Sequence, residues 1–146
     1  MTDAQILKRY TVVTLITFVA LILISLALDV LAGVDAGAGM GIASIIVPAM
    51  DAGGTYVRKT GTLLDKPRMW RLAPIFTMIN FGLGLLILMG FSALSGFNIG
   101  VVLAQVGFVG MLLILVGVMG LYLLVGRFFL GMGARSEMKR QERTRR

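Results

Sequence analysis

The 146-residue sequence contains no histidine and no cysteine, and these two absences exclude several kinds of chemistry. Without cysteine there is no disulfide framework and no thiolate ligand for a metal. Without histidine there is no imidazole ligand and no histidine general base, and haem held by either residue is excluded as well. The sequence also shows no paired carboxylates of the kind that hydrolytic enzymes use. We therefore predict a protein that is not an enzyme and that binds neither a cofactor nor a metal.

Charged residues are also scarce, at 14% of the chain, whereas hydrophobic residues make up 58%. A soluble domain carries about 25% charged residues. The charges of this chain are clustered, which leaves long uncharged runs between them. This combination is typical of a membrane protein with several spans, which we treat as a single domain.

Four apolar runs are each long enough to cross a bilayer as a helix, which takes roughly 20 residues. Because the bilayer core offers no water to backbone groups, the runs are predicted to be α-helices, packed as an antiparallel bundle through short connections. Their approximate bounds are Tyr10–Val30, Ala38–Val57, Leu72–Leu94 and Ile99–Phe129. The second run is the least regular, since it is rich in small residues and contains Pro48 and Asp51.

The basic residues favour four crossings. If all four runs cross, every one of the 14 lysine and arginine residues lies on one side. The two connections on the other side then contain no basic residue, and one of them includes Asp35. Basic residues gather on the cytoplasmic side of membrane proteins. We therefore predict that both termini are cytoplasmic.

Glycines recur in the fourth run, where Gly107, Gly110, Gly117 and Gly120 fall on one broad side of a helix. Small residues on a helix face let another helix backbone approach closely, which is a main packing device in lipid. One interpretation is packing within the chain, where Ala49, Gly53 and Gly54 of the second run repeat the theme. The other is that part of the glycine face contacts another subunit.

Asp51 is the unexpected residue of the second run, because a carboxylate at the bilayer centre costs about 2.5–3.5 kcal/mol. It lies seven residues before Arg58, roughly 10 Å inside the cytoplasmic face. Polar residues of the other runs fall near the same depth, and they are Thr14, Thr17, Asn80 and Tyr122. In a structural interpretation, Asp51 pairs with Arg71, Lys59 or a threonine hydroxyl. In a functional one, the polar layer binds a proton, a cation or a small polar ligand.

The cytoplasmic face is basic, and its cations are expected to contact anionic lipid headgroups. In the loop between the second and third runs, Gly61 predicts a turn and Asp65 a helix cap. The C-terminal segment 131–146 is predicted to be a basic tail, with Gly131 and Gly133 loosening the helix before it. Nucleic acid is not expected as a partner, since the tail lacks aromatic stacking groups. The residues expected to face lipid headgroups are Arg58, Lys59, Lys66, Arg68, Arg71, Arg135, Lys139 and Arg140.

The stretch from Thr55 to Ala73, TYVRKTGTLLDKPRMWRLA, resembles a loop in a family of small four-helix inner-membrane proteins of proteobacteria, a family that is itself uncharacterised. The shared pattern comprises Tyr56, Val57, Arg58, Gly61, Pro67 and Arg71. This chain has Thr62 where the family usually has arginine, and it lacks the acidic residue that follows the proline. The resemblance implies a bacterial inner-membrane location and no particular activity.

These observations predict a non-catalytic accessory or scaffold subunit of a larger membrane complex, whose partner is another membrane protein or a second copy. The extramembrane segments are too short to fold as domains, and glycine surface is abundant. The alternative is a small oligomeric transporter or channel that uses Asp51, Asn80 and Thr17. The accessory role predicts that arginine or threonine side chains close off Asp51, with a glycine face turned outward. The transport role predicts a water-accessible Asp51.

Overall fold

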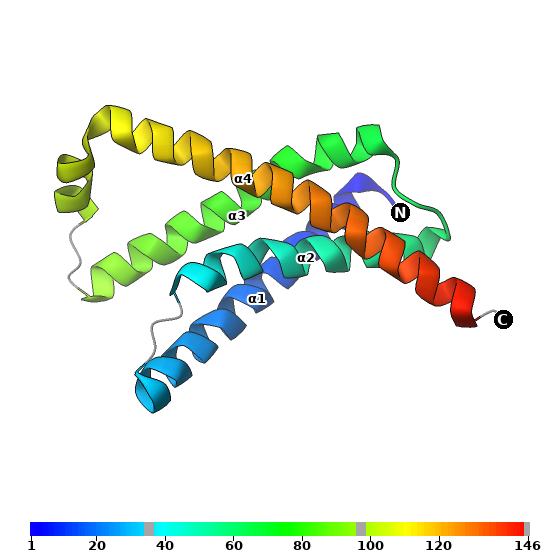
Figure 1. Ribbon diagram of the computed structural model, residues 1–146, viewed down its shortest axis with the longest axis horizontal. Coiled ribbons are helices and arrows are strands. Elements are labelled where there is room, and N and C mark those ends of the chain that lie inside the picture. The colour runs from blue at the N-terminus through cyan, green and yellow to red at the C-terminus, as the bar shows by residue number, and fades with distance from the viewer. Residues whose placement is uncertain (34–36, 96–98, 145–146) are drawn as a thin grey trace.

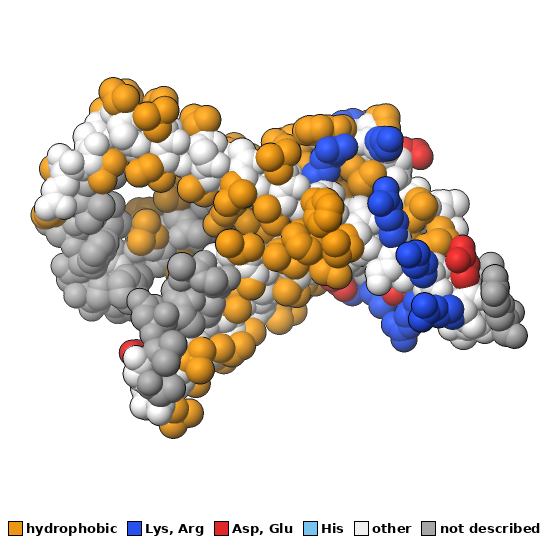
Figure 2. Space-filling view, viewed as in Figure 1, with side chains coloured by type: hydrophobic (Ala, Val, Ile, Leu, Met, Phe, Trp, Pro, Cys, Tyr) orange, Lys and Arg blue, Asp and Glu red, His pale blue; other side chains and the backbone are white. Residues whose placement is uncertain are grey.

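The computed structural model describes residues 1–33, 37–95 and 99–144, and these form four α-helices and no strand. The helices are α1 (Asp3–Ala32), α2 (Gly37–Thr60), α3 (Lys66–Ser95) and α4 (Ile99–Thr144). They run in alternating directions, so that both termini and the α2–α3 connection lie at one end (Figure 1). Lysine and arginine side chains gather there (Figure 2), and we call it the basic end. The all-α prediction is therefore confirmed.

Local sequence signals explain where the helices begin and end. Thr2 and Gln5 form a reciprocal capping box at the start of α1. Gly33 ends α1 in the left-handed conformation, and Gly61 does the same after α2, with φ values of 61° and 68°. Helix α3 begins directly after Asp65, as predicted. In the two connections at the opposite end, residues 34–36, with Asp35, and 96–98 lie outside the described residues.

Helix α4 departs from the prediction at two places. Gly107 has a φ of 71° and a ψ of 162°, so two helical segments meet at this residue. Toward the other end, α4 continues through Gly131 and Gly133 to Thr144. The prediction that these glycines loosen the helix is therefore wrong, because both sit where a neighbouring helix packs against α4. Arg145 and Arg146 lie outside the described residues.

The most extensive helix contact is between α2 and α4. A Cβ atom placed on Gly53 would collide with the backbone carbonyl oxygen of Leu130, and one placed on Gly133 would collide with the backbone of Met50. Neither position has room for any side chain. The two glycines thus allow the backbones of α2 and α4 to touch, as small residues do between membrane helices.

The hydrophobic core surrounds this contact and lies toward the basic end. All four helices contribute to it, together with Leu64 of the α2–α3 connection. The buried core side chains are Ile6, Tyr10, Ala49, Ala52, Tyr56, Val57, Leu64, Leu72, Phe76, Leu130 and Ala134. Of these, Leu130 directly precedes the segment that was expected to be a loose tail, and Ala134 lies within it. The C-terminal part of α4 is therefore integral to the core.

Three of the helices are long and apolar enough to cross a membrane, namely α1, α3 and α4. Their apolar side chains are largely exposed within the chain: Leu31 of α1 is 84% exposed and Leu113 of α4 is 67% exposed. Surfaces of this kind are what lipid or a partner helix covers in a membrane protein. Over the residues whose side chains the structure describes, helix α2 is not among the three, and this part contains small residues and Asp51.

We expect Gly53→Ala and Gly133→Ala each to destabilise the fold by about 1–3 kcal/mol, because the new methyl group meets backbone atoms that cannot move aside cheaply. Gly82→Ala is the matched control, since no atom lies within 4 Å of its added Cβ. This control should be neutral or stabilising by up to about 1 kcal/mol, the usual helix preference for alanine. Chemical unfolding in detergent micelles measures all three. Equal effects at the three positions would contradict the tight α2–α4 contact.

Candidate functional site

Asp51 is held between two arginines. Its carboxylate accepts hydrogen bonds from Nε and Nη2 of Arg9, at 2.7 and 3.0 Å. The Nη2 of Arg58 lies 3.6 Å from Oδ1 of the same carboxylate. The Asp51 side chain is 26% exposed. A two-point arginine–carboxylate pair of this kind fixes geometry as well as charge, so this cluster locks α1 against α2.

The predicted partners of Asp51 need correction, because Arg9 replaces Arg71, Lys59 and the threonines. Sequence reasoning placed Arg9 at the membrane face, outside the first span. Helix α1 in fact begins at Asp3, so Arg9 lies roughly 9 Å along the helix. Asp51 lies roughly 13 Å before the end of α2. The two residues therefore meet at similar depth. Extending the first predicted helix back to Asp3 would have placed Arg9 beside Asp51.

A second ion-pair cluster ties the N-terminus to α3. Nε of Arg68 donates to Asp3 at 2.6 Å, and Arg71 lies 3.7 Å from the same carboxylate. Arg68 also donates to the hydroxyl of Tyr56 and to the backbone carbonyl of Met1, at 3.1 and 2.9 Å. The guanidinium of Arg68 thus bridges α1, α2 and α3.

Tyr10 organises the polar part of the core, although sequence reasoning did not select it. It is fully buried, and its ring stacks on Phe76 with centroids 3.7 Å apart. Its hydroxyl accepts a hydrogen bond from Nδ2 of Asn80. Asn80 is 2% exposed, and its Oδ1 has no hydrogen-bond partner among the described residues. Asn80 therefore serves α1–α3 packing and does not reach Asp51.

The remaining members of the predicted polar layer do not converge on Asp51 either. The hydroxyls of Thr14 and Thr17 donate to backbone carbonyls of their own helix, those of Tyr10 and Val13, both at 2.8 Å. Tyr122 is half-buried and its hydroxyl lies close to Gly41 of α2. The side chains share a general depth, but each has its own partner.

The predicted glycine face of α4 is largely open. A Cβ atom on Gly117 or Gly120 would meet no other atom within 4 Å, whereas one on Gly110 would meet Val106 of the same helix. The expectation that all four glycines share one continuous face needs correction, because the break at Gly107 separates it from the other three. We call Gly117 and Gly120 the open glycine pair.

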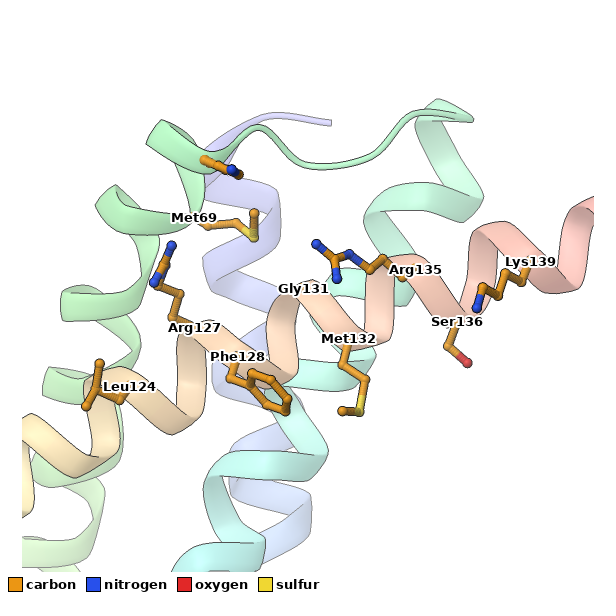
Figure 3. A pocket seen from close by; sticks show the side chains of 10 residues that line it. Met69, Leu124, Arg127, Phe128, Gly131, Met132, Arg135, Ser136 and Lys139 are labelled. Atoms are coloured by element: carbon orange, nitrogen blue, oxygen red, sulfur yellow. The ribbon is translucent and has the colours of Figure 1, made fainter.

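A groove of about 690 Å³ lies between α3 and α4 at the basic end (Figure 3). Four cations line it, together with a hydroxyl and apolar side chains, and we call it the α3–α4 groove. Its lining residues are Lys66, Met69, Leu124, Arg127, Phe128, Gly131, Met132, Arg135, Ser136 and Lys139. Three of the predicted lipid-facing residues, Lys66, Arg135 and Lys139, are thus brought together here.

The other predicted lipid-facing residues have different surroundings. Arg58, Arg68 and Arg71 are engaged in the two ion-pair clusters. Arg140 lines a second groove with Arg58 and Glu137. Lys59 is exposed near the end of α2. Among the described residues, the basic end therefore combines arginines paired with Asp3 and Asp51 with other cations that form no ion pair.

Comparisons of this chain with protein-family models, curated proteins and solved structures found no match.

A double-mutant cycle on Arg9→Gln and Asp51→Asn measures the α1–α2 ion pair. We expect a coupling free energy of about 1 kcal/mol or more, because the pair has two aligned hydrogen bonds and is only partly exposed. The same cycle with Arg71→Gln in place of Arg9→Gln should give no coupling to Asp51, since Arg71 contacts Asp3. Chemical unfolding in micelles supplies the free energies. A coupling that appears with Arg71 instead would refute the assignment.

We also expect Tyr10→Phe to destabilise the fold by about 1–3 kcal/mol, because it leaves the buried Asn80 amide without its acceptor while the ring stacking stays. Tyr122→Phe serves as the control, since no described residue hydrogen-bonds its hydroxyl and it should change stability little. Thermal unfolding followed by circular dichroism compares the two. Similar shifts for both variants would argue against the Tyr10–Asn80 hydrogen bond.

Proposed function

We propose that this chain is a non-catalytic accessory or scaffold subunit of a larger membrane protein complex. In this proposal all four helices cross a bacterial cytoplasmic membrane, with both termini in the cytoplasm. The alternating helix directions support the fourth crossing, since α1 leaves the basic end and α2 brings the chain back to it before α3 leaves it again (Figure 1). The gathering of cations at one end supports the orientation, because basic residues favour the cytoplasmic side (Figure 2).

The observation that carries the proposal is the open glycine pair. The chain uses Gly53 and Gly133 for its own tightest helix contact, and it leaves Gly117 and Gly120 facing open space. Apolar side chains beside them are strongly exposed, with Leu113 at 67% and Leu121 at 50%. A shallow glycine surface framed by large apolar residues suits a transmembrane helix better than lipid alone, because it permits close backbone approach.

The surroundings of Asp51 support an accessory role over transport. Two arginine side chains occupy its carboxylate, and neither groove described above is lined by Asp51, Asn80 or Thr17. An intramembrane carboxylate that binds a cargo needs access to it. Here the carboxylate joins α1 to α2, which is a structural task.

The proposal is tested by isolating the tagged full-length chain from its native membrane in mild detergent and weighing the product by native mass spectrometry. We expect a complex with another membrane protein at fixed stoichiometry. The double substitution Gly117→Ile with Gly120→Ile should abolish it, because branched side chains keep the partner backbone away.

The matched control adds bulk on the flanks of α4 through Leu112→Phe and Ile114→Phe, at positions 49% and 58% exposed. These lie about a quarter turn from the open glycine pair, and the complex should survive. A complex that tolerates the glycine substitutions would show that the partner binds elsewhere. A lone homo-oligomer would refute the accessory role, and Asp51→Asn in a proteoliposome flux assay would then test transport.

A further inference from the structure

The cations of the α3–α4 groove have no acidic partner among the described residues. Asp51 and Asp3 each neutralise arginines elsewhere, on α1, α2 and α3. The groove itself is lined by Lys66, Arg127, Arg135 and Lys139, and no acidic residue lines it. Four like charges that share one groove repel each other, so an external anion is favoured there.

Arg127 is the most constrained of these cations. Its guanidinium carbon lies 4.1 Å from the ring centre of Trp70, and its Nε is buried without a hydrogen-bond partner among the described residues. A buried donor without a partner costs free energy, which an acceptor from a ligand would recover. Arg127 and Arg135 both extend toward the side of α4 where Met69 of α3 lies (Figure 3).

The groove is also amphipathic along its length. On α4, the spacing of four residues produces two adjacent rows. One row contains Arg127, Gly131, Arg135 and Lys139, and the other contains Leu124, Phe128, Met132 and Ser136. Gly131 leaves room for the sulfur of Met69, which lies 3.5 Å from where its Cβ would be. Leu124 and Phe128 are 58% and 62% exposed, and they extend the groove toward the apolar half of α4.

We propose that the α3–α4 groove binds the phosphate headgroup of one anionic phospholipid, with an acyl chain lying along Leu124 and Phe128. Arginine side chains recognise phosphate through several hydrogen bonds. A soluble phosphate would leave the apolar row uncovered, whereas a lipid covers both rows. This inference rests on the membrane location proposed above and is independent of the accessory role.

Trp70 is the only tryptophan of the chain and therefore reports on this groove. The full-length chain is reconstituted in vesicles that contain brominated phosphatidylglycerol or brominated phosphatidylcholine, whose acyl bromines quench tryptophan fluorescence on contact. We expect stronger quenching by the anionic lipid. The apparent affinity for phosphatidylglycerol should exceed that for phosphatidylcholine by about fivefold or more, because one basic residue near an anionic lipid contributes about 1 kcal/mol, which is a factor of about five. Inorganic phosphate in the buffer should not remove the preference.

Arg127→Gln with Arg135→Gln should reduce this preference at least about fivefold, to near parity between the two lipids. Arg127→Lys with Arg135→Lys keeps the charge and should retain most of it. The matched control, Lys8→Gln with Arg143→Gln, removes two exposed charges outside the groove. Its preference should stay within about twofold of the original chain, since distant surface charges are screened. Circular dichroism checks that each variant keeps its helical content.

Three results would overturn the proposed lipid site. They are equal quenching of the original chain by both lipids, a preference that survives the glutamine substitutions, and an equal loss in the Lys8 and Arg143 control. Absence of quenching by either lipid would overturn the membrane location together with the site. Isolation of the chain without a partner protein would refute only the accessory role and would leave the lipid result unaffected.

Discussion

The direct backbone contact between α2 and α4 is the constraint on which the rest of the structure depends. Gly53 and Gly133 bring these helices closer than any side chain would permit. Leu130 and Ala134 enter the core beside this contact, and α1 and α3 complete the core around it. Because interiors are packed without spare volume, the position of every other helix follows from this separation. The ion pairs at Asp51 and Asp3 then hold α1 in place against α2 and α3.

The sequence predicted the helices well, because long apolar runs and end signals act locally. The turn at Gly61 and the start of α3 after Asp65 were both confirmed, since left-handed glycines and helix starts need no knowledge of the fold. Gly133 was misread for the same reason. A glycine near a basic segment looks like a helix breaker locally, and only the opposing backbone of Met50 shows that it is a packing residue.

The candidate site could be predicted only in part. The unusual position of Asp51 was visible in the sequence, and so was the supply of nearby cations. Its partner, Arg9, was not visible. The prediction placed every basic residue at the membrane face and did not extend the first helix beyond its apolar run. Tyr10 was missed because an aromatic at the start of a span usually marks the interface. Its burial depends on Phe76 and Asn80, which are about 70 positions away.

The place of the core along the chain has a consequence for biogenesis. Among the described residues, helix α2 is the one helix that is not a membrane-span candidate, and its main contact is with α4, where residues 130–134 lie against it. Chains emerge from the ribosome N-terminus first and fold in that order where they can. Here α2 has been synthesised long before its partner exists. Its final position is therefore reached only after residues 130–134 of α4 have been made, so α2 cannot settle at the time when it is itself synthesised.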